Sequence, residues 1–283
     1  MKQRNFEMKT VGKGGLVVAV TACIHGNEHV GLYVHEWLLE NRKNLEGEVR
    51  LIFGNPEAYL NSRRFMEKNL NRAFPGSLDG NYEQRQAYRI MQEIQGADLH
   101  IDFHSTTNPV DSFAICIAGK DDTDLVRATG LENVMVYAAP DSGKGYAGKT
   151  LNQVMECPSI AVECGQHNKQ STIRTGISIM RNVLMHYGIM KGEAKYADQD
   201  FFLLTGPLVE TQKDMEIPKG IKEFQEVLPG SVVGKGKDGT LHATESFYPI
   251  LVDRDTRIRE DGVLMLMSQK VEYAHGKVLG KLK

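Results

Sequence analysis

The chain has 283 residues, of which 41% are hydrophobic and 25% charged, and its formal net charge is −2. This composition is typical of a globular protein and predicts one large domain with a smaller one attached. So small a net charge argues against a nucleic-acid partner, and no apolar run approaches the ~20 residues of a membrane span. The four cysteines contain no C-x-x-C pair and suggest no disulfide framework, so we expect a cytoplasmic protein.

The first part of the chain alternates apolar strands with helical segments. The run LVVAV at 16–20 has the length of a buried strand and is too short for a secretion signal. Apolar residues then follow the spacing of an amphipathic helix over 28–42, at Val30, Tyr33, Val34, Trp37 and Leu38. The next predicted segments are a strand at 49–53, a long loop at 55–77, a helix at 83–94 and a strand at 99–103.

The same alternation continues to about residue 187. Further strands are predicted at 113–118, 134–138 and 159–164, and further helices at 149–156 and 172–187. Strands that alternate with helices indicate a mostly parallel or mixed sheet with helices on both faces. The sequence therefore predicts an α/β fold.

The remaining residues have a different character. From about Lys191 the chain is polar, and short β-rich runs follow, separated by proline and glycine turns. We expect an α/β domain at 1–195 and a small all-β domain at 196–283.

Polar residues at strand ends predict a metal site. His25 and Glu28 follow the first strand, and a separation of three residues lets both side chains face one point. An imidazole and a carboxylate form half of a zinc site, and a catalytic zinc needs a third protein ligand. His104, just past the strand at 99–103, is the candidate. His100 competes for this role because it lies on the same face of that strand, but its mid-strand position favours a place in the core.

Two further features accompany these candidate ligands. Glu163 ends the apolar strand at 159–164, where a carboxylate is costly unless it is paired or functional. The loop at 55–77 carries the polar residues Arg63, Arg64, Asn71 and Arg72. An isolated loop arginine is most simply a solvated surface group, and Cys23 and Cys164 are most simply small buried thiols.

Five motifs resemble the aspartoacylase and succinylglutamate desuccinylase family, which is related to the zinc carboxypeptidases. In chain order they are A-C-I-H-G-N-E at 22–28, N-P-x-A at 55–58, R-F followed by L-N-R-x-F at 64–74, D-F-H-S-T at 102–106 and E-x-G at 163–165. The resemblance covers roughly the first 190 residues. It implies a zinc carboxypeptidase-like mixed sheet flanked by helices, and the β-rich tail looks like the family's second domain.

The resemblance also implies roles at the metal site. His25, Glu28 and His104 would hold one Zn²⁺ per chain, which lowers the pKa of a bound water toward ~7. Glu163 would take a proton from that water and pass it to the departing amine. Asp102 could orient a ligand histidine from behind.

The resemblance further implies how a substrate is held. Arg64 would face the carbonyl oxygen as it becomes an oxyanion, and Asn71 and Arg72 would bind the substrate's carboxylate. Aspartoacylases carry an arginine where this chain has Gln153, and a second-domain tyrosine for which 253–261 offers no counterpart. N-acetylaspartate is therefore not predicted as the substrate. Two residues of that segment are candidates to reach the site instead, Arg257 and Arg259.

One motif favours a different class of protein. GKGYAGKT at 143–150 fits the phosphate-loop pattern G-x-x-x-x-G-K-T and follows the predicted strand at 134–138, as in a nucleotide-binding ATPase or GTPase. Only a short helix can follow before Pro158, and no other nucleotide motif accompanies it. A glycine-rich lid beside the zinc site accounts for the same residues.

The sequence thus predicts a zinc-dependent amidohydrolase that releases an acyl group from an N-acyl amino acid or a similar small amide. A zinc carboxypeptidase acting on short peptides is the alternative within the same fold. A zinc-binding protein without turnover is disfavoured because Glu163 and Arg64 are both present. The acyl group, the amine half, the native metal and homo-oligomer formation stay open.

Overall fold

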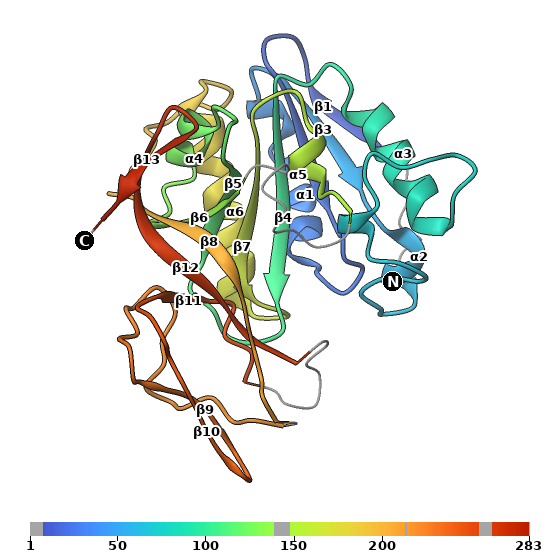
Figure 1. Cartoon of the computed structure of the whole chain (residues 1–283). Helices are drawn as coiled ribbons and strands as arrows, with labels where there is room; N and C mark the ends of the chain where they lie inside the picture. Colours follow the sequence, from blue (N-terminus) through green and yellow to red (C-terminus); the bar gives the residue numbers. More distant parts are fainter. Residues whose placement is uncertain (1–7, 139–147, 213, 255–261, 283) are drawn as a thin grey trace.

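The computed structural model describes residues 8–138, 148–212, 214–254 and 262–282. Its helices are α1 (Val30–Glu40), η1 (Arg42–Asn44), α2 (Pro56–Leu60), η2 (Leu70–Arg72), α3 (Tyr82–Ile94), α4 (Thr123–Ala128), α5 (Leu151–Val154) and α6 (Gln170–His186). Its strands are β1 (Lys9–Gly12), β2 (Val17–Ala22), β3 (Glu48–Phe53), β4 (Leu99–Thr106), β5 (Phe113–Ile117), β6 (Asn133–Tyr137), β7 (Ser159–Gln166), β8 (Asp200–Val209), β9 (Val232–Gly236), β10 (Gly239–His242), β11 (Tyr248–Ile250), β12 (Val263–Ala274) and β13 (Lys277–Lys281). The predicted α/β architecture is confirmed, with helices beside a large central sheet (Figure 1).

The central sheet is mixed, and its strand order decides where polar side chains gather. The order is β1-β3-β2-β4-β7-β5-β6-β8-β12-β11, with β13 paired to β12. Strand β4 runs parallel to both of its neighbours, β2 and β7. The carboxyl ends of these three strands therefore meet at one edge of the sheet, which is where ligands bind in α/β proteins.

Two apolar cores lie on opposite faces of this sheet. On one face β4 contributes Ile101 and Phe103 to a core completed by α1 and α6. On the other face Ile90 and Ile94 of α3 pack with Leu70 of η2. Because strand side chains alternate, the even-numbered residues of β4 point away from α1 and α6.

The loop predicted at 55–77 contains two short helical turns. Asn55 caps α2 by accepting from Ala58 N, and Asn69 caps η2 by accepting from Asn71 N. Neither turn is long enough to have an apolar period, so periodicity could not reveal them. The predicted helix at 149–156 is reduced to the four residues of α5.

Most strands of the C-terminal part continue the central sheet, whereas β9 and β10 form a separate two-stranded sheet. Strand β8 pairs in parallel with β6, and β12 pairs antiparallel with β8. Among the described residues after 187 there are strands and no helix. The expected boundary at 195/196 lies in the segment between α6 and β8, while β9 and β10 form a hairpin that projects from the rest (Figure 1). In the described part of the chain, every helix is too short or too polar to cross a membrane.

Candidate metal centre

A tight connection between β2 and α1 carries the first two candidate ligands. Its backbone turns at Cys23, which has a φ of 55°. A Cβ on Gly26 would lie 2.4 Å from the backbone of Ala58, so a glycine is needed here because α2 packs directly against the turn. Gly26 N also donates to Arg64 O at 3.0 Å. These contacts hold His25 and Glu28 against the loop that follows α2.

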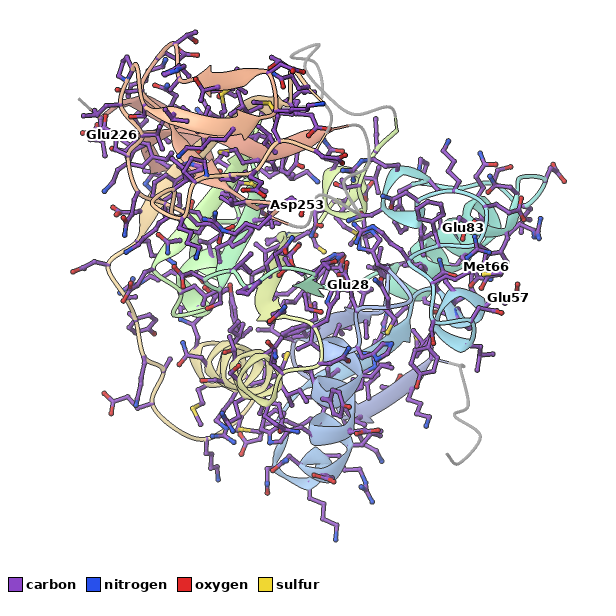
Figure 2. The ribbon with its side chains drawn as sticks, turned by 90° about the horizontal axis from the view of Figure 1, so that it is seen from below. Glu28, Glu57, Met66, Glu83, Glu226 and Asp253 are labelled. Atoms are coloured by element: carbon purple, nitrogen blue, oxygen red, sulfur yellow. The ribbon has the colours of Figure 1, made fainter. Side chains whose placement is uncertain are left out.

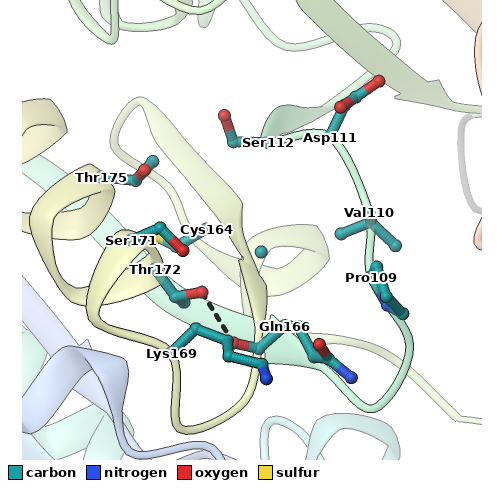
Figure 3. A pocket seen from close by; sticks show the side chains of 11 residues that line it. Pro109, Val110, Asp111, Ser112, Cys164, Gln166, Lys169, Ser171, Thr172 and Thr175 are labelled. Atoms are coloured by element: carbon teal, nitrogen blue, oxygen red, sulfur yellow. Dashed lines mark hydrogen bonds between the residues drawn. The ribbon is translucent and has the colours of Figure 1, made fainter.

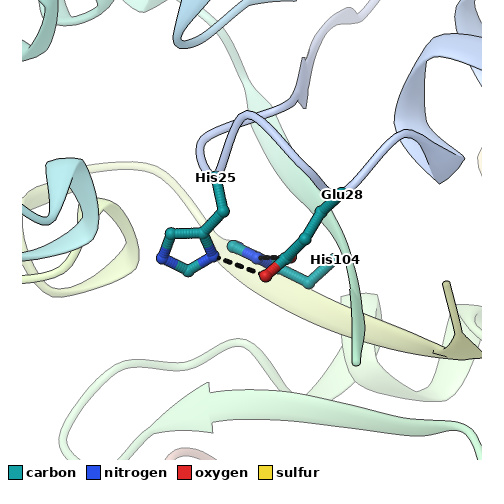
Figure 4. Close-up of side chains that lie close together, drawn as sticks. All are labelled: His25, Glu28 and His104. Atoms are coloured by element: carbon teal, nitrogen blue, oxygen red, sulfur yellow. Dashed lines mark hydrogen bonds and ion pairs between the residues drawn. The ribbon is translucent and has the colours of Figure 1, made fainter. Parts of the chain in front are cut away.

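The third candidate, His104, comes from β4 and meets the other two below the turn. One ligand atom from each of His25, Glu28 and His104 lies within 4.8 Å of the others, and all three residues are buried (Figure 4). Nδ1 of His25 is 2.8 Å from Oε1 of Glu28, and Nδ1 of His104 is 2.8 Å from Oε2. The two imidazoles therefore converge on the two oxygens of one carboxylate.

The far nitrogen of each imidazole is held by an oxygen. His25 Nε2 lies 3.1 Å from Asn69 Oδ1, and His104 Nε2 lies 2.6 Å from Asp102 Oδ2. An amide or carboxylate oxygen only accepts, so each Nε2 carries a proton and each Nδ1 is the nitrogen turned toward Glu28. Such outer partners are typical of metal-ligating histidines.

This donor set fits a zinc ion. His25 Nδ1 has no hydrogen-bond partner among the described residues although it is buried beside Glu28. Burial lowers the pKa of His25 to about 4, so its ring is neutral, which is the form that binds a metal. A lone pair that faces a carboxylate is unfavourable unless a cation lies between them. Two imidazoles and one carboxylate are also the ligand types of a catalytic zinc with an open fourth position.

The other two ligands influence each other's ionisation. Burial by itself would raise the pKa of Glu28, but the neighbouring imidazoles of His25 and His104 hold that pKa well below its usual range. Burial by itself would lower the pKa of His104, but Asp102 and Glu28 raise it well above its usual range. A metal ion at this point would replace the proton on His104 Nδ1.

Arg64 lies at the rim of the cluster. Its Nη1 donates to Glu28 Oε1 at 2.7 Å, and its side chain is 42% exposed. On the opposite side, Ser105 N donates to Glu28 Oε2 at 3.2 Å. Both oxygens of Glu28 are thus oriented by groups from separate elements, with a guanidinium on the open side. The neighbouring Arg63 is exposed and contacts none of the candidate ligands in the described structure.

Glu163 lies beside the cluster on β7. The register of β4 and β7 pairs Glu163 with His104, so both side chains point to the same face of the sheet. Burial, followed by the charge of Glu28, raises the pKa of Glu163 to about 8. Its Oε2 is buried and accepts no hydrogen bond from the described residues. This is a carboxyl group able to hold or release a proton near neutral pH.

Asn71 and Arg72 are connected to the cluster through η2. Asn69 Oδ1 accepts from Asn71 N at 2.9 Å and also contacts His25. Asn71 Oδ1 accepts from Leu151 N at 3.1 Å, which leaves the amide nitrogen as the end available to an anion. Arg72 Nη1 donates to the carbonyl oxygen of Asn71 at 2.6 Å. Among the described residues, the candidate metal-binding cluster consists of His25, Glu28 and His104 and includes neither of these side chains.

The arginine loop, residues 61–69 between α2 and η2, is anchored by a buried carboxylate that no sequence pattern singles out. Glu83, in the first turn of α3, accepts from the backbone nitrogens of Met66, Glu67 and Lys68 at 2.6, 3.1 and 3.1 Å. Glu83 and Met66 are labelled side by side in Figure 2. Asn69 was also missed. In both cases the role depends on contacts between elements that are distant in sequence, and no local pattern signals them.

Several other predicted features are placed by the structure or lie outside it. His100 is fully buried and does not belong to the ligand cluster. Gln153 closes a capping box with Thr150 on α5, which is one turn long and unlike the helix of a phosphate loop. Residues 143–147 of the phosphate-loop pattern lie outside the described residues, as do Arg257 and Arg259.

An open pocket of about 370 Å³ lies on the opposite face of β7 from the cluster. Cys164 lines it together with Lys169, Ser171 and Thr172 at the start of α6 (Figure 3). The Thr172 hydroxyl donates to Gln166 O at 2.6 Å. Strand β7 therefore separates this pocket from Glu163 and the ligands.

Comparison with known proteins gives relatives along most of the chain. It is 25% identical to the probable aspartoacylase of Nostoc sp., over 89% of this chain and 96% of that protein. It is 24% identical to the succinylglutamate desuccinylase of Pseudomonas fluorescens, over 78% of this chain and 73% of that protein. The crystal structure of a succinylglutamate desuccinylase/aspartoacylase from Rhodobacter sphaeroides has the same fold, with a TM-score of 0.77 at 17% identity over 94% of this chain and 89% of that one.

A family model confirms the resemblance that the motifs indicated. The model of the succinylglutamate desuccinylase/aspartoacylase catalytic domain matches residues 15–187. This range contains all five motifs and more than half of the chain. The chain belongs to the succinylglutamate desuccinylase/aspartoacylase family.

Proposed function

We propose that this chain is a zinc-dependent deacylase that hydrolyses the amide bond of an N-acyl amino acid, with one zinc ion per chain. The convergence of His25 Nδ1 and His104 Nδ1 on the carboxylate of Glu28 is the observation that carries the proposal. Its relatives bear the names of aspartoacylase and succinylglutamate desuccinylase, which are hydrolases of non-peptide C–N bonds. A cytoplasmic location is proposed as well, supported by four free cysteines.

The protein's own residues divide the work around the reacting amide. Zinc, when bound, supplies Lewis acidity to the attacking water and the amide carbonyl. Glu163 takes the proton from the water on a carboxylate oxygen and delivers it to the nitrogen of the departing amine. Its raised pKa keeps proton uptake and release within reach of neutral pH. The guanidinium of Arg64, on the open side of Glu28, stabilises the oxyanion that forms on the carbonyl.

Substrate binding is assigned to the segment around η2. The side-chain amide nitrogen of Asn71 and the guanidinium of Arg72 are suited to a carboxylate, which a planar bidentate cation binds better than a lysine does. A substrate that carries a carboxylate next to its amide nitrogen fits this arrangement. N-acyl amino acids have that structure.

The test combines a substrate panel with a variant of the proton carrier. Zinc-loaded protein is assayed on N-acetyl and N-succinyl amino acids and on short peptides. Glu163→Gln should keep the zinc and the fold but lose about 10²- to 10⁴-fold in kcat, the usual contribution of a general acid–base. Release of amino acid from peptides alone would replace the proposal by a carboxypeptidase, and normal turnover by Glu163→Gln would remove Glu163 from the mechanism.

A further inference from the structure

A row of polar side chains continues behind the ligands, inside the central sheet. Thr21 on β2, His100 on β4 and Ser159 on β7 are fully buried, as is Asp102. Strand register brings them together, since Thr21 pairs with Asp102 and His100 pairs with Ser159. Polar groups at such positions cost free energy unless each finds a hydrogen-bond partner. The partners they find form a continuous chain.

Short hydrogen bonds connect this row to the third metal ligand. Asp102 Oδ2 accepts from His104 Nε2 at 2.6 Å, and Asp102 Oδ1 accepts from the Thr21 hydroxyl at 2.7 Å. Thr21 Oγ1 also lies 3.0 Å from His100 Nε2. Behind it, His100 Nδ1 lies 2.8 Å from Ser159 Oγ.

The chemistry of these groups fixes which partner donates at each step. An ionised carboxylate only accepts, so the Thr21 hydroxyl donates to Asp102 and its oxygen must accept from His100 Nε2. Burial lowers the pKa of His100 to about 4, so the ring is neutral and carries its one proton on Nε2. Nδ1 then accepts from the Ser159 hydroxyl. That hydroxyl in turn accepts from Asn152 Nδ2 at 3.0 Å.

We infer that His100 and Thr21 are positioning residues that set, through Asp102, which ring nitrogen of the third ligand faces the metal. This inference rests on the metal site proposed above. With Thr21 donating to Oδ1, Asp102 presents Oδ2 to His104 and keeps a proton on Nε2. Nδ1 is then the nitrogen whose lone pair would be offered to the metal, with any proton on it released to solvent. If the hydroxyl were missing, Oδ1 would be a buried acceptor without a donor, and Asp102 would be free to rotate away from the ligand.

Which group donates and which accepts along this series of hydrogen bonds can be observed in the absence of metal. In metal-free full-length protein labelled with ¹⁵N, the ring shifts of His100 should be those of the neutral Nε2–H form from about pH 6 to 9. This is the form that lets the ring donate to Thr21 and accept from Ser159. If the ring were protonated on Nδ1 alone, or on both nitrogens, it could not accept from Ser159 as described. That result would overturn the inference.

The effect on the metal is tested by two variants at one position. Thr21→Val has the same shape without the hydroxyl, whereas Thr21→Ser keeps it. Thr21→Val should bind zinc about tenfold more weakly than the unmodified protein. This is the low end of the ~10- to 100-fold loss expected when a metal ligand loses a direct hydrogen-bond partner. Thr21→Ser should restore most of the lost affinity. Ile101→Val, on the opposite face of β4, controls for loss of packing and should leave zinc affinity unchanged.

The outcomes separate this inference from the proposed function. Equal zinc affinity of Thr21→Val and Thr21→Ser, alongside tight binding by the unmodified protein, overturns the inference and leaves the metal site standing. Failure of the unmodified protein to bind zinc overturns the metal site itself and the inference with it. A loss of zinc affinity in Ile101→Val equal to that in Thr21→Val would assign the effect to packing and also overturn the inference.

Discussion

The two ligand histidines donate from Nε2, the ring nitrogen turned away from Glu28, to different kinds of acceptor. Asp102 is an ionised, fully buried acceptor for His104, whereas Asn69 offers only a neutral amide oxygen to His25. A carboxylate partner increases the basicity of an imidazole more than an amide does. We therefore expect His104 to be the stronger zinc ligand, with Asn69 acting mainly to fix the orientation of the His25 ring.

Asn69→Ala should weaken zinc binding by about 10- to 100-fold, because His25 loses the acceptor that holds its Nε2 proton. Zinc affinity is measured by competition with a chromophoric chelator. Asn61→Ala is the matched control, since Asn61 is exposed on the same loop and its side-chain amide nitrogen donates to Glu57 O of α2. Unchanged affinity in Asn69→Ala would show that the ring needs no support from this side.

Arg64 and Arg72 are expected to affect different kinetic constants. Arg72 binds a carboxylate that is present in both the substrate and the transition state, so Arg72→Ala should raise KM and change kcat little. Arg64 acts on charge that appears only during the reaction, so Arg64→Ala should mainly lower kcat. Arg63→Ala, at an exposed neighbouring position, is the control.

A modified substrate sharpens this comparison. Converting the substrate's α-carboxylate to an amide should greatly weaken the unmodified enzyme and weaken Arg72→Ala only slightly, because the variant has already lost the partner. Equal turnover of the acid and the amide by the unmodified enzyme would mean that no carboxylate is bound at this position.

At the scale of elements, the sequence predicted what local periodicity encodes. The helices α1, α3 and α6 lie within a few residues of their predicted bounds, because each has an apolar stripe of several turns. Strand β1, with the sequence KTVG, was missed because four residues with one buried side chain carry no alternation. His25 and Glu28 were found because they follow the end of β2. His104 was found because it follows the predicted strand at 99–103, although β4 extends to Thr106. Asn69 and Glu83 were not, because their partners come from other segments.

The loop between α2 and η2 depends on one side chain of α3. Glu83→Ala would leave three backbone donors without their acceptor and should lower the free energy of unfolding by about 2–4 kcal/mol. It should also lower kcat, because Arg64 lies on the same loop. Urea unfolding and steady-state assays measure the two effects. Glu57→Ala removes an exposed carboxylate on α2 and should change neither the free energy of unfolding nor kcat. If Glu83→Ala were as stable as the unmodified protein but inactive, Glu83 would position the loop without contributing to stability.

At the scale of the whole molecule, both expected domains share one sheet. Strand β8 covers the outer edge of β6, and Phe202 of β8 packs with Phe113 and Met135 in a common core. Asn108, after β4, also donates to Asp253 at 2.8 Å. Pairing between strands so distant in sequence has no local signature, which is why the sequence alone could not predict that β8 and β12 extend the same sheet.

This continuity predicts a single unfolding transition. Urea unfolding followed by the fluorescence of Trp37, the one tryptophan of the chain, should coincide with loss of hydrogen-exchange protection in β12. A chain ending at residue 195 should aggregate, because it exposes the edge of β6 together with Phe113 and Met135. Two separate transitions, or a stable folded fragment 1–195, would show that the parts are independent.

The packing of Gly26 on α2 bears on how fast a metal can enter and leave. The turn that carries two ligands is pressed against the backbone of Ala58, and the ligands themselves are buried. Because the ligand atoms are buried and Arg64 of the arginine loop lies over Glu28, we expect release to a chelator in solution to be faster when that loop moves aside. The lifetime of the zinc-bound protein is then governed by the rate at which that loop opens. Slow exchange of the metal would reflect this kinetic barrier in addition to the equilibrium affinity for zinc.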